Sequence, residues 1–151
     1  MFKNVLTRFR NKKPTEINVD KETLLYIYKM LHSMRLDLVE CFYNIKNRRL
    51  RELYDGFALM MIKLDKTIQF LRRVLNEDLY AKYDKLSSDE INEIITKLPL
   101  EVSVSLRSLV QNTKLLKEFS VLTAPPYINT IIRSINEIID DIAKYLDRVV
   151  R

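Results

Sequence analysis

Glycine is almost absent from this chain: Gly56 is the only one among 151 residues, and only four residues are prolines. β-Sandwiches and doubly wound α/β folds need frequent glycine-rich turns, and no run of neighbouring segments alternates apolar and polar residues. With 47% hydrophobic residues, the chain is still long enough to bury one core. We therefore predict an all-α fold made of a few long helices.

Histidine and cysteine are equally scarce, with His32 and Cys41 as the single examples. Zinc sites and nucleophile–histidine arrangements lack their usual parts, and one glycine cannot form a loop that binds nucleotide phosphates. Carboxylates at helical spacing, such as Glu137 and Asp141, lack the Glu-x-x-His pairs that hold metals in helical bundles. We predict no catalytic residue, no metal site, no cofactor and no enzymatic activity.

A single cysteine also excludes an intramolecular disulfide, and its apolar neighbours predict a buried thiol. The longest uncharged run, residues 119–132, contains Pro125 and Pro126, and charges interrupt the N-terminal apolar positions too often for a signal peptide. We expect a cytoplasmic protein with no membrane-spanning segment.

The positive charge of the chain is unevenly placed. The net charge is +6, and residues 1–80 hold 16 Lys and Arg against 10 Asp and Glu, so the whole excess lies in the first half. Such an asymmetry indicates a polyanionic partner, either anionic lipid or nucleic acid, unless it is only a solvated helix face.

Residues 1–13 form a short basic amphipathic segment, which we call the stub. Its apolar side chains fall at i, i+3, i+4 and i+7, and we predict that they insert into a membrane: Phe2, Val5, Leu6 and Phe9. Its cations are predicted to bind anionic lipid headgroups: Lys3, Arg8, Arg10, Lys12 and Lys13.

After a linker at residues 14–20, in which Asp20 can cap a helix, residues 21–151 are predicted to form the helical core. A first apolar seam steps by three and four through Leu24, Ile27, Leu31, Met34, Leu38, Cys41 and Ile45. A second seam follows through Leu50, Tyr54, Phe57, Met61, Leu64, Ile68, Leu71 and Leu75. The two seams predict a long helical hairpin, with either a tight turn near Asn47 or a bend near Asp55 and Gly56.

Shorter helices are predicted downstream of the hairpin. Ser87 and Glu90 have the spacing of a capping box and begin a helix that stops at Pro99. A fourth helix covers residues 100–122, and the last, residues 127–151, carries isoleucines on one face.

Four more cations gather at the break between the two seams and are predicted to bind headgroups, at about 1 kcal/mol each: Lys46, Arg48, Arg49 and Arg51. Duplex DNA would use the same charges, yet the chain has no recognisable helix-turn-helix, reading helix or basic groove with stacking aromatics. A basic nucleic-acid-binding protein and a helical adaptor or regulator stay as alternatives.

Three stretches, in order along the chain, carry a family resemblance. Residues 57–68 read FALMMIKLDKTI, residues 98–109 read LPLEVSVSLRSL, and residues 135–147 read INEIIDDIAKYLD. Together with the Met-Phe start, the stub and the hairpin, they resemble the ESCRT-III family, most closely the archaeal CdvB-type cell-division proteins. The given sequence resembles a short form, without the winged helix and the proline-rich segment that engages the disassembling AAA ATPase.

The resemblance implies a peripheral membrane protein that polymerises with itself or with paralogous subunits and acts in membrane constriction or scission, during cell division or vesicle or virus budding. It further implies that the last helix can fold onto the hairpin of its own or a neighbouring subunit. Contact with an AAA ATPase is expected to be indirect, and nucleic acid is not an expected partner.

Overall fold

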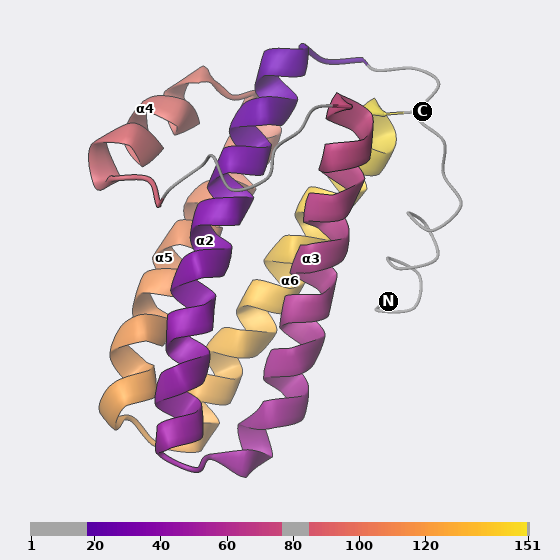
Figure 1. The fold of residues 1–151 in the computed structure, drawn as a ribbon. Helices are drawn as coiled ribbons and strands as arrows, with labels where there is room; N and C mark the ends of the chain where they lie inside the picture. The colour runs from indigo at the N-terminus through magenta and orange to yellow at the C-terminus, as the bar shows by residue number, and fades with distance from the viewer. Residues whose placement is uncertain (1–17, 77–84, 151) are drawn as a thin grey trace.

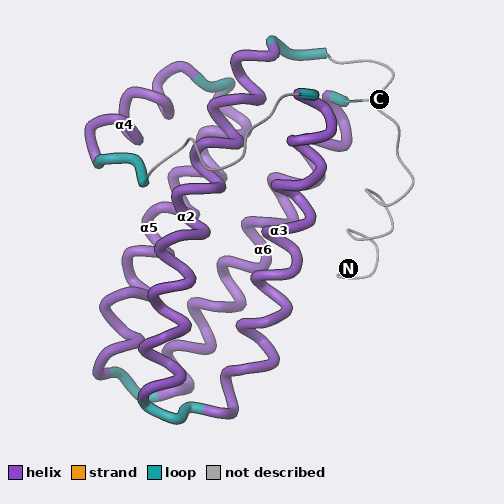
Figure 2. The backbone as a smooth tube through the Cα atoms, in the orientation of Figure 1, coloured by secondary structure: helices purple, strands orange, loops and turns teal. Residues whose placement is uncertain are grey.

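The computed structural model describes residues 18–76 and 85–150. Within this part the chain is helical and contains no β-strand (Figure 1) (Figure 2). It forms five α-helices and one 3-10 turn: α2 (Lys21–Asn47), η1 (Arg51–Leu53), α3 (Tyr54–Leu75), α4 (Ser88–Lys97), α5 (Leu100–Leu122) and α6 (Pro125–Val149). The all-α prediction is confirmed, whereas the stub lies outside the described residues.

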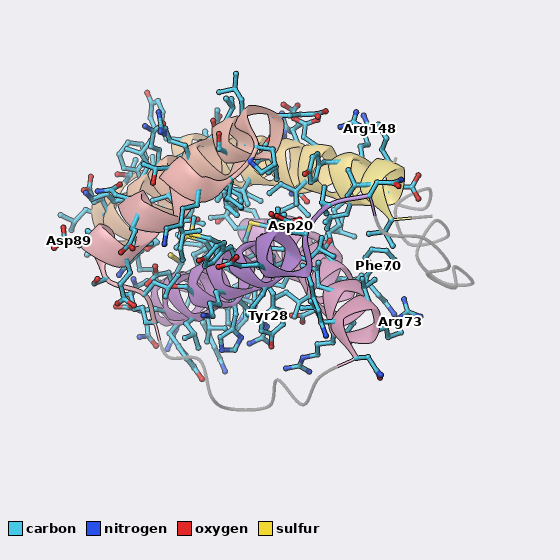
Figure 3. All side chains as sticks on the ribbon, turned by 90° about the horizontal axis from the view of Figure 1, so that it is seen from above. Asp20, Tyr28, Phe70, Arg73, Asp89 and Arg148 are labelled. Atoms are coloured by element: carbon cyan, nitrogen blue, oxygen red, sulfur yellow. The ribbon has the colours of Figure 1, made fainter. Side chains whose placement is uncertain are left out.

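Four of the helices form a bundle in which each has two neighbours. α2 packs against α3 and α5, and α6 packs against the same two helices, so α2 lies diagonal to α6 and α3 diagonal to α5. α2 and α5 run in one direction, and α3 and α6 run in the other (Figure 1). Seen along the bundle in Figure 3, α2 and α3 form one layer and α5 and α6 the other. α4 contacts α2 and α5 from outside.

The two predicted seams and the isoleucines of the last helix supply about half of the buried apolar residues. Every residue of the first seam is buried on α2, and the isoleucines of α6 are buried opposite, apart from the partly buried Ile138. Most members of the second seam are buried as predicted, namely Phe57, Leu64, Ile68, Leu71 and Leu75, whereas Leu50, Tyr54 and Met61 are only partly buried. Leu53 of η1 and Met60 of α3 are buried in place of Tyr54 and Met61, because α3 packs against both α2 and α6 and its buried face is wider than a single seam.

A tight turn joins α2 to α3, as one of the two alternatives predicted. The amide of Leu50 donates to the Ile45 carbonyl at 3.1 Å and that of Arg49 to the Lys46 carbonyl at 3.0 Å. This is the Schellman pattern, and Arg49 occupies its left-handed position with φ 57°. Gly56 is an ordinary helical residue inside α3.

Replacing Gly56 with alanine is expected to raise the free energy of unfolding by about 0.5–1 kcal/mol, because glycine costs that much in a helix interior. An added Cβ would lie 3.8 Å from Ile132 Cγ2 and 3.9 Å from Asn129 Oδ1, which are ordinary van der Waals distances. Denaturant unfolding followed by circular dichroism measures the change. A less stable variant would mean that α3 and α6 approach more closely than this structure has them.

The N-terminal ends of α4 and α2 carry the two capping residues predicted from the sequence. Ser87 and Glu90 form the predicted capping box: the Glu90 amide donates to Ser87 Oγ at 3.2 Å, and the Ser87 amide donates to Glu90 Oε1 at 3.1 Å. This hydrogen bonding lowers the pKa of Glu90. Asp20 stands at the N-cap of α2 as predicted, but its side chain makes no capping hydrogen bond. Its backbone carbonyl accepts from the Leu24 amide instead.

Ion pairs join neighbouring helices on both sides of the bundle. Lys63 of α3 meets Asp140 of α6 at 3.0 Å, and Arg35 of α2 meets Asp65 of α3 at 2.5 Å. The Lys63 side chain is only 7% exposed and that of Asp140 17%. The first pair therefore holds α6 onto the α2–α3 hairpin from inside the packed surface.

Candidate functional site

Two turns lie together at one end of the bundle. The α2–α3 turn and the α5–α6 turn are separated by about 75 positions in the sequence, yet they are neighbours in space (Figure 1). The Asn44 side-chain amide donates to Ser120 Oγ at 3.1 Å across the gap between α2 and α5. We call this end the turn end.

Arg48 connects the two turns. Its guanidinium donates from Nη1 to the Ser120 carbonyl at 3.0 Å and from Nη2 to the Thr123 carbonyl at 2.9 Å. These carbonyls end α5, where the backbone carries unpaired acceptors and a partial negative charge. The sequence grouped Arg48 with the headgroup-binding cations, but the structure gives it a capping role that no local pattern signals, because its partners are 72 and 75 residues away.

The other three predicted cations of this turn, Lys46, Arg49 and Arg51, are exposed. Leu122 ends α5 and Tyr127 lies in the first turn of α6, on either side of the α5–α6 turn, and they are 85% and 63% exposed. We call these five residues the turn-end surface. Apolar and aromatic side chains surrounded by Lys and Arg are the composition of protein surfaces that lie at the headgroup level of a bilayer. Sequence analysis found the cations and missed Leu122 and Tyr127, since each continues a helical apolar pattern.

An apolar hollow opens beside the turn-end surface, between η1 and the first turn of α6. It has a volume of about 410 Å³ and is lined by Glu52, Leu53, Pro125, Pro126 and Asn129. The exposed carboxylates of Glu52 and Asp55 stand at this side of the turn. Lys46 lies at the end of α2 and Arg49 in the turn after it, whereas Arg51 lies in η1 beside Glu52.

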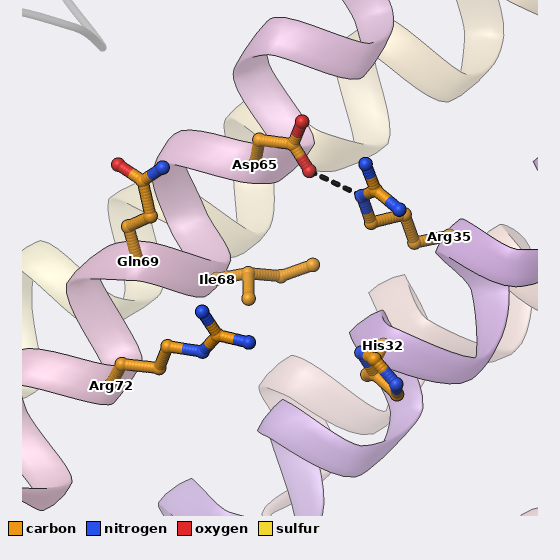
Figure 4. Close-up of a pocket in the computed structure, with 6 residues that line it drawn as sticks. All are labelled: His32, Arg35, Asp65, Ile68, Gln69 and Arg72. Atoms are coloured by element: carbon orange, nitrogen blue, oxygen red, sulfur yellow. Dashed lines mark hydrogen bonds and ion pairs between the residues drawn. The ribbon is translucent and has the colours of Figure 1, made fainter. Parts of the chain in front are cut away.

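A second hollow, of about 250 Å³, lies between α2 and α3 (Figure 4). Arg35 points across it to Asp65, and Arg72 donates from Nε to the Tyr28 hydroxyl at 3.3 Å. The Tyr28 ring in turn stacks on His32, with 6.0 Å between ring centroids. These contacts link the two hairpin helices side by side, so we assign the polar groups of this hollow to hairpin packing.

Cys41 is fully buried, as predicted, beside a charged cluster that joins α2 to α5. Asp37 accepts from Lys85 at 2.6 Å and from Lys117 at 3.3 Å. Burial, and next the Asp37 carboxylate, raises the pKa of the Cys41 thiol to about 12. A neutral, enclosed thiol of this kind has a packing role.

Residues 18–76 and 85–150 include no helix that is both long and apolar enough to cross a bilayer. In the same residues no group of three or more His, Cys, Asp or Glu is placed to hold a metal ion. Comparisons with protein-family models, curated proteins and solved structures find no match to the chain. Its described part belongs to the class of all-helical bundles, here with one end that is both basic and apolar.

Proposed function

We propose that this chain is a non-enzymatic subunit of a membrane-remodelling filament of the ESCRT-III kind, acting from the cytoplasm on an anionic membrane during constriction or scission. The observation that supports it best is the turn-end surface. There Leu122, which is 85% exposed, lies at the same end of the bundle as three exposed cations, in a protein whose charge excess lies wholly in its first half. Copies of the chain, or paralogous subunits, would be its partners in the polymer.

Of the two proposed membrane contacts, the turn-end surface lies at one end of the bundle, and the stub precedes a linker whose residue Asn18 lies at the other end. The Asn18 amide donates to the Val149 carbonyl at 2.7 Å, so this linker residue lies beside the end of α6, away from the turn end. The 27 residues of α2 span about 40 Å between these ends. Each contact is small, and many subunits acting together in a polymer would give the avidity that one lacks.

The packing of α6 supports a closed form of the proposed subunit. Its buried isoleucines cover α3 and α5, and Asp140 pairs with Lys63 within the same interface. Exposing this apolar face to water would be costly. In the proposal, α6 leaves the hairpin only where a neighbouring subunit replaces these contacts, which couples opening to assembly.

Removal of residues 1–13 is expected to reduce co-sedimentation with anionic liposomes more than tenfold, because it removes five cations and four apolar side chains. Neutral liposomes provide the lipid control, and far-UV circular dichroism checks that the bundle, which begins at Lys21, is retained. Equal binding by the full and truncated chains would contradict the role of the stub. Steep, salt-dependent binding to duplex DNA without lipid binding would support the nucleic-acid alternative.

Replacing Lys46, Arg49 and Arg51 together with alanine is expected to weaken liposome binding on the order of a hundredfold at low salt, from about 1 kcal/mol per cation. Arg48 stays unchanged because it caps α5. The matched control replaces three exposed cations elsewhere, Lys114, Arg133 and Lys144, which lowers the net charge equally. If both triple variants lose the same affinity, net charge explains binding and the turn-end surface has no special role.

A further inference from the structure

α5 carries apolar side chains on two faces. One face is buried in the bundle through Val102, Leu106, Leu109 and Leu116. The other is a stripe along the outside, spaced by steps of three and four, which we call the α5 stripe: Leu100, Val104, Ser108, Gln111, Leu115, Glu118 and Leu122. Its four apolar members are exposed, and Leu100 is 79% exposed. The stripe itself carries one charge, and the exposed cations Arg107 and Lys114 lie beside it.

α3 presents a second outward stripe, which we call the α3 stripe: Asp55, Ala58, Leu59, Ile62, Lys66, Gln69 and Arg73. Leu59 and Ile62 are exposed and lie in its half nearer the turn end. Arg73, in the other half, points away from the bundle (Figure 3). The α3 stripe has two cations against one anion, and the α5 stripe has one anion, Glu118, with the exposed cations Arg107 and Lys114 beside it.

The two stripes face in opposite directions. α3 and α5 are at diagonal corners of the bundle and do not touch, so their outer faces lie on opposite sides of one molecule. A contact between the α3 stripe of one copy and the α5 stripe of the next uses different surfaces on each partner. Such a heterologous contact leaves one stripe free at each end and repeats without closing in a pair.

We infer that these stripes are the assembly faces of the filament, with the α3 stripe of each copy packed on the α5 stripe of the next. In copies of the same orientation, the apolar parts of both stripes nearest the turn end come together: Leu59 and Ile62 on one side, Leu115 and Leu122 on the other. The inference rests on the proposed function, since it assigns to a second copy of this chain the surface that a filament requires.

The area of the contact fits a polymer better than a stable dimer. The 23 residues of α5 are about 35 Å long and a helix is about 10 Å wide. One helix face of this size buries roughly 350 Å² per copy, below the roughly 800 Å² per partner of standard stable complexes. The contact is therefore weak by itself and becomes effective when copies are concentrated on a surface.

Cysteine cross-linking tests which stripes meet. The native Cys41 is fully buried, so the full-length chain needs no background substitution. Equal amounts of the Ile62→Cys and Leu115→Cys variants, mixed on anionic liposomes and oxidised, are expected to give a disulfide-linked dimer that neither variant gives alone. The double variant Ile62→Cys/Leu115→Cys is expected to give a ladder of higher oligomers.

Leu36 provides a matched control, because it is 39% exposed against 42% for Leu115 and belongs to neither stripe. A mixture of Leu36→Cys and Leu115→Cys is expected to give no dimer above the level of either variant alone. A dimer from Leu115→Cys by itself would show α5 pairing with α5, and no product from the first mixture would show that the stripes do not meet. Either result overturns the inference.

The same reactions run without lipid at high protein concentration separate the inference from the proposed function. Cross-linking in solution by a chain that ignores liposomes would uphold the assembly faces and refute the membrane role. Liposome binding without cross-linking would uphold the membrane role and refute the assembly faces. As a second measurement, Leu115→Glu is expected to abolish filaments seen by electron microscopy with less than about 0.5 kcal/mol change in stability, as for other surface substitutions. Filaments that persist in this variant would contradict the inference.

Discussion

Replacing Lys63 with methionine is expected to lower the free energy of unfolding by about 3–5 kcal/mol, because it leaves the Asp140 carboxylate without its cation in a nearly dry interface. Lys63 Nζ lies 3.0 Å from Asp140 Oδ1 and donates to Oδ2 at 3.0 Å. Methionine keeps a flexible apolar stem of similar length, so the loss is attributable to the unpaired charge more than to packing. Denaturant titration at constant ionic strength measures it.

The double variant Lys63→Met/Asp140→Leu is expected to recover most of that loss, because an apolar pair of similar volume often replaces a buried ion pair at little cost. Lys97→Met is the matched control, since Lys97 is about half exposed, pairs with the exposed Glu93 at 3.2 Å and lies 5.6 Å from the Tyr26 ring centroid, and it should cost less than about 1 kcal/mol. A loss below 1 kcal/mol in the Lys63 variant would contradict the prediction, because water would then reach Asp140 easily.

The Lys63–Asp140 pair also affects the proposed release of α6 from the hairpin. In the closed bundle it joins the last helix to the α2–α3 hairpin. Removing the lysine alone should therefore favour release of α6, and in the proposal it should lower the protein concentration at which filaments form on liposomes. The double variant, with its apolar replacement, should keep the closed form and assemble less readily.

The Cys41 thiol is expected to react with iodoacetamide at neutral pH at least a thousandfold more slowly in the folded protein than in the unfolded chain. Burial first, and the Asp37 carboxylate second, raise its pKa from 9.0 to about 12. Each unit lowers the thiolate fraction about tenfold, and the thiolate is the reactive species. Complete burial adds a steric barrier to the reagent.

The raised pKa of Cys41 also predicts how the stability of the protein changes at alkaline pH. Below pH 9 the thiol is protonated in both states, so the folded protein loses nothing. Between pH 9 and about 12 the unfolded chain releases the proton and the folded chain retains it, so the free energy of unfolding falls as the pH rises.

Labelling of Cys41 with iodoacetamide, with and without guanidinium chloride and followed by mass spectrometry, measures the reaction rates of the unfolded and folded chains. Rapid labelling of the native chain would mean that α2 and α5 separate readily.

Much of the secondary structure follows from local rules. The three-and-four spacing of apolar residues in the two seams predicts both hairpin helices, the Ser87 and Glu90 pair predicts the start of α4, and Pro99 marks its end. These signals act within one or two turns of helix, where hydrogen bonds and side-chain spacing depend only on near neighbours. The tight turn at Arg49 was one of two predicted alternatives. The apolar spacing of the two seams is equally compatible with a turn near Asn47 and with a bend near Asp55 and Gly56.

The sequence by itself thus determined an all-helical chain, the ends of most helices and the uneven charge, because each depends on composition or on contacts within a few residues. Only the tertiary structure decided that Arg48 caps α5, that Met60 replaces Met61 in the core, and that Leu122 lies at the same end of the bundle as the cations of the other turn. It also decided that the second apolar face of α5 stays uncovered. These outcomes depend on which helices become neighbours, and an apolar periodicity states that a face must be buried without stating against which partner.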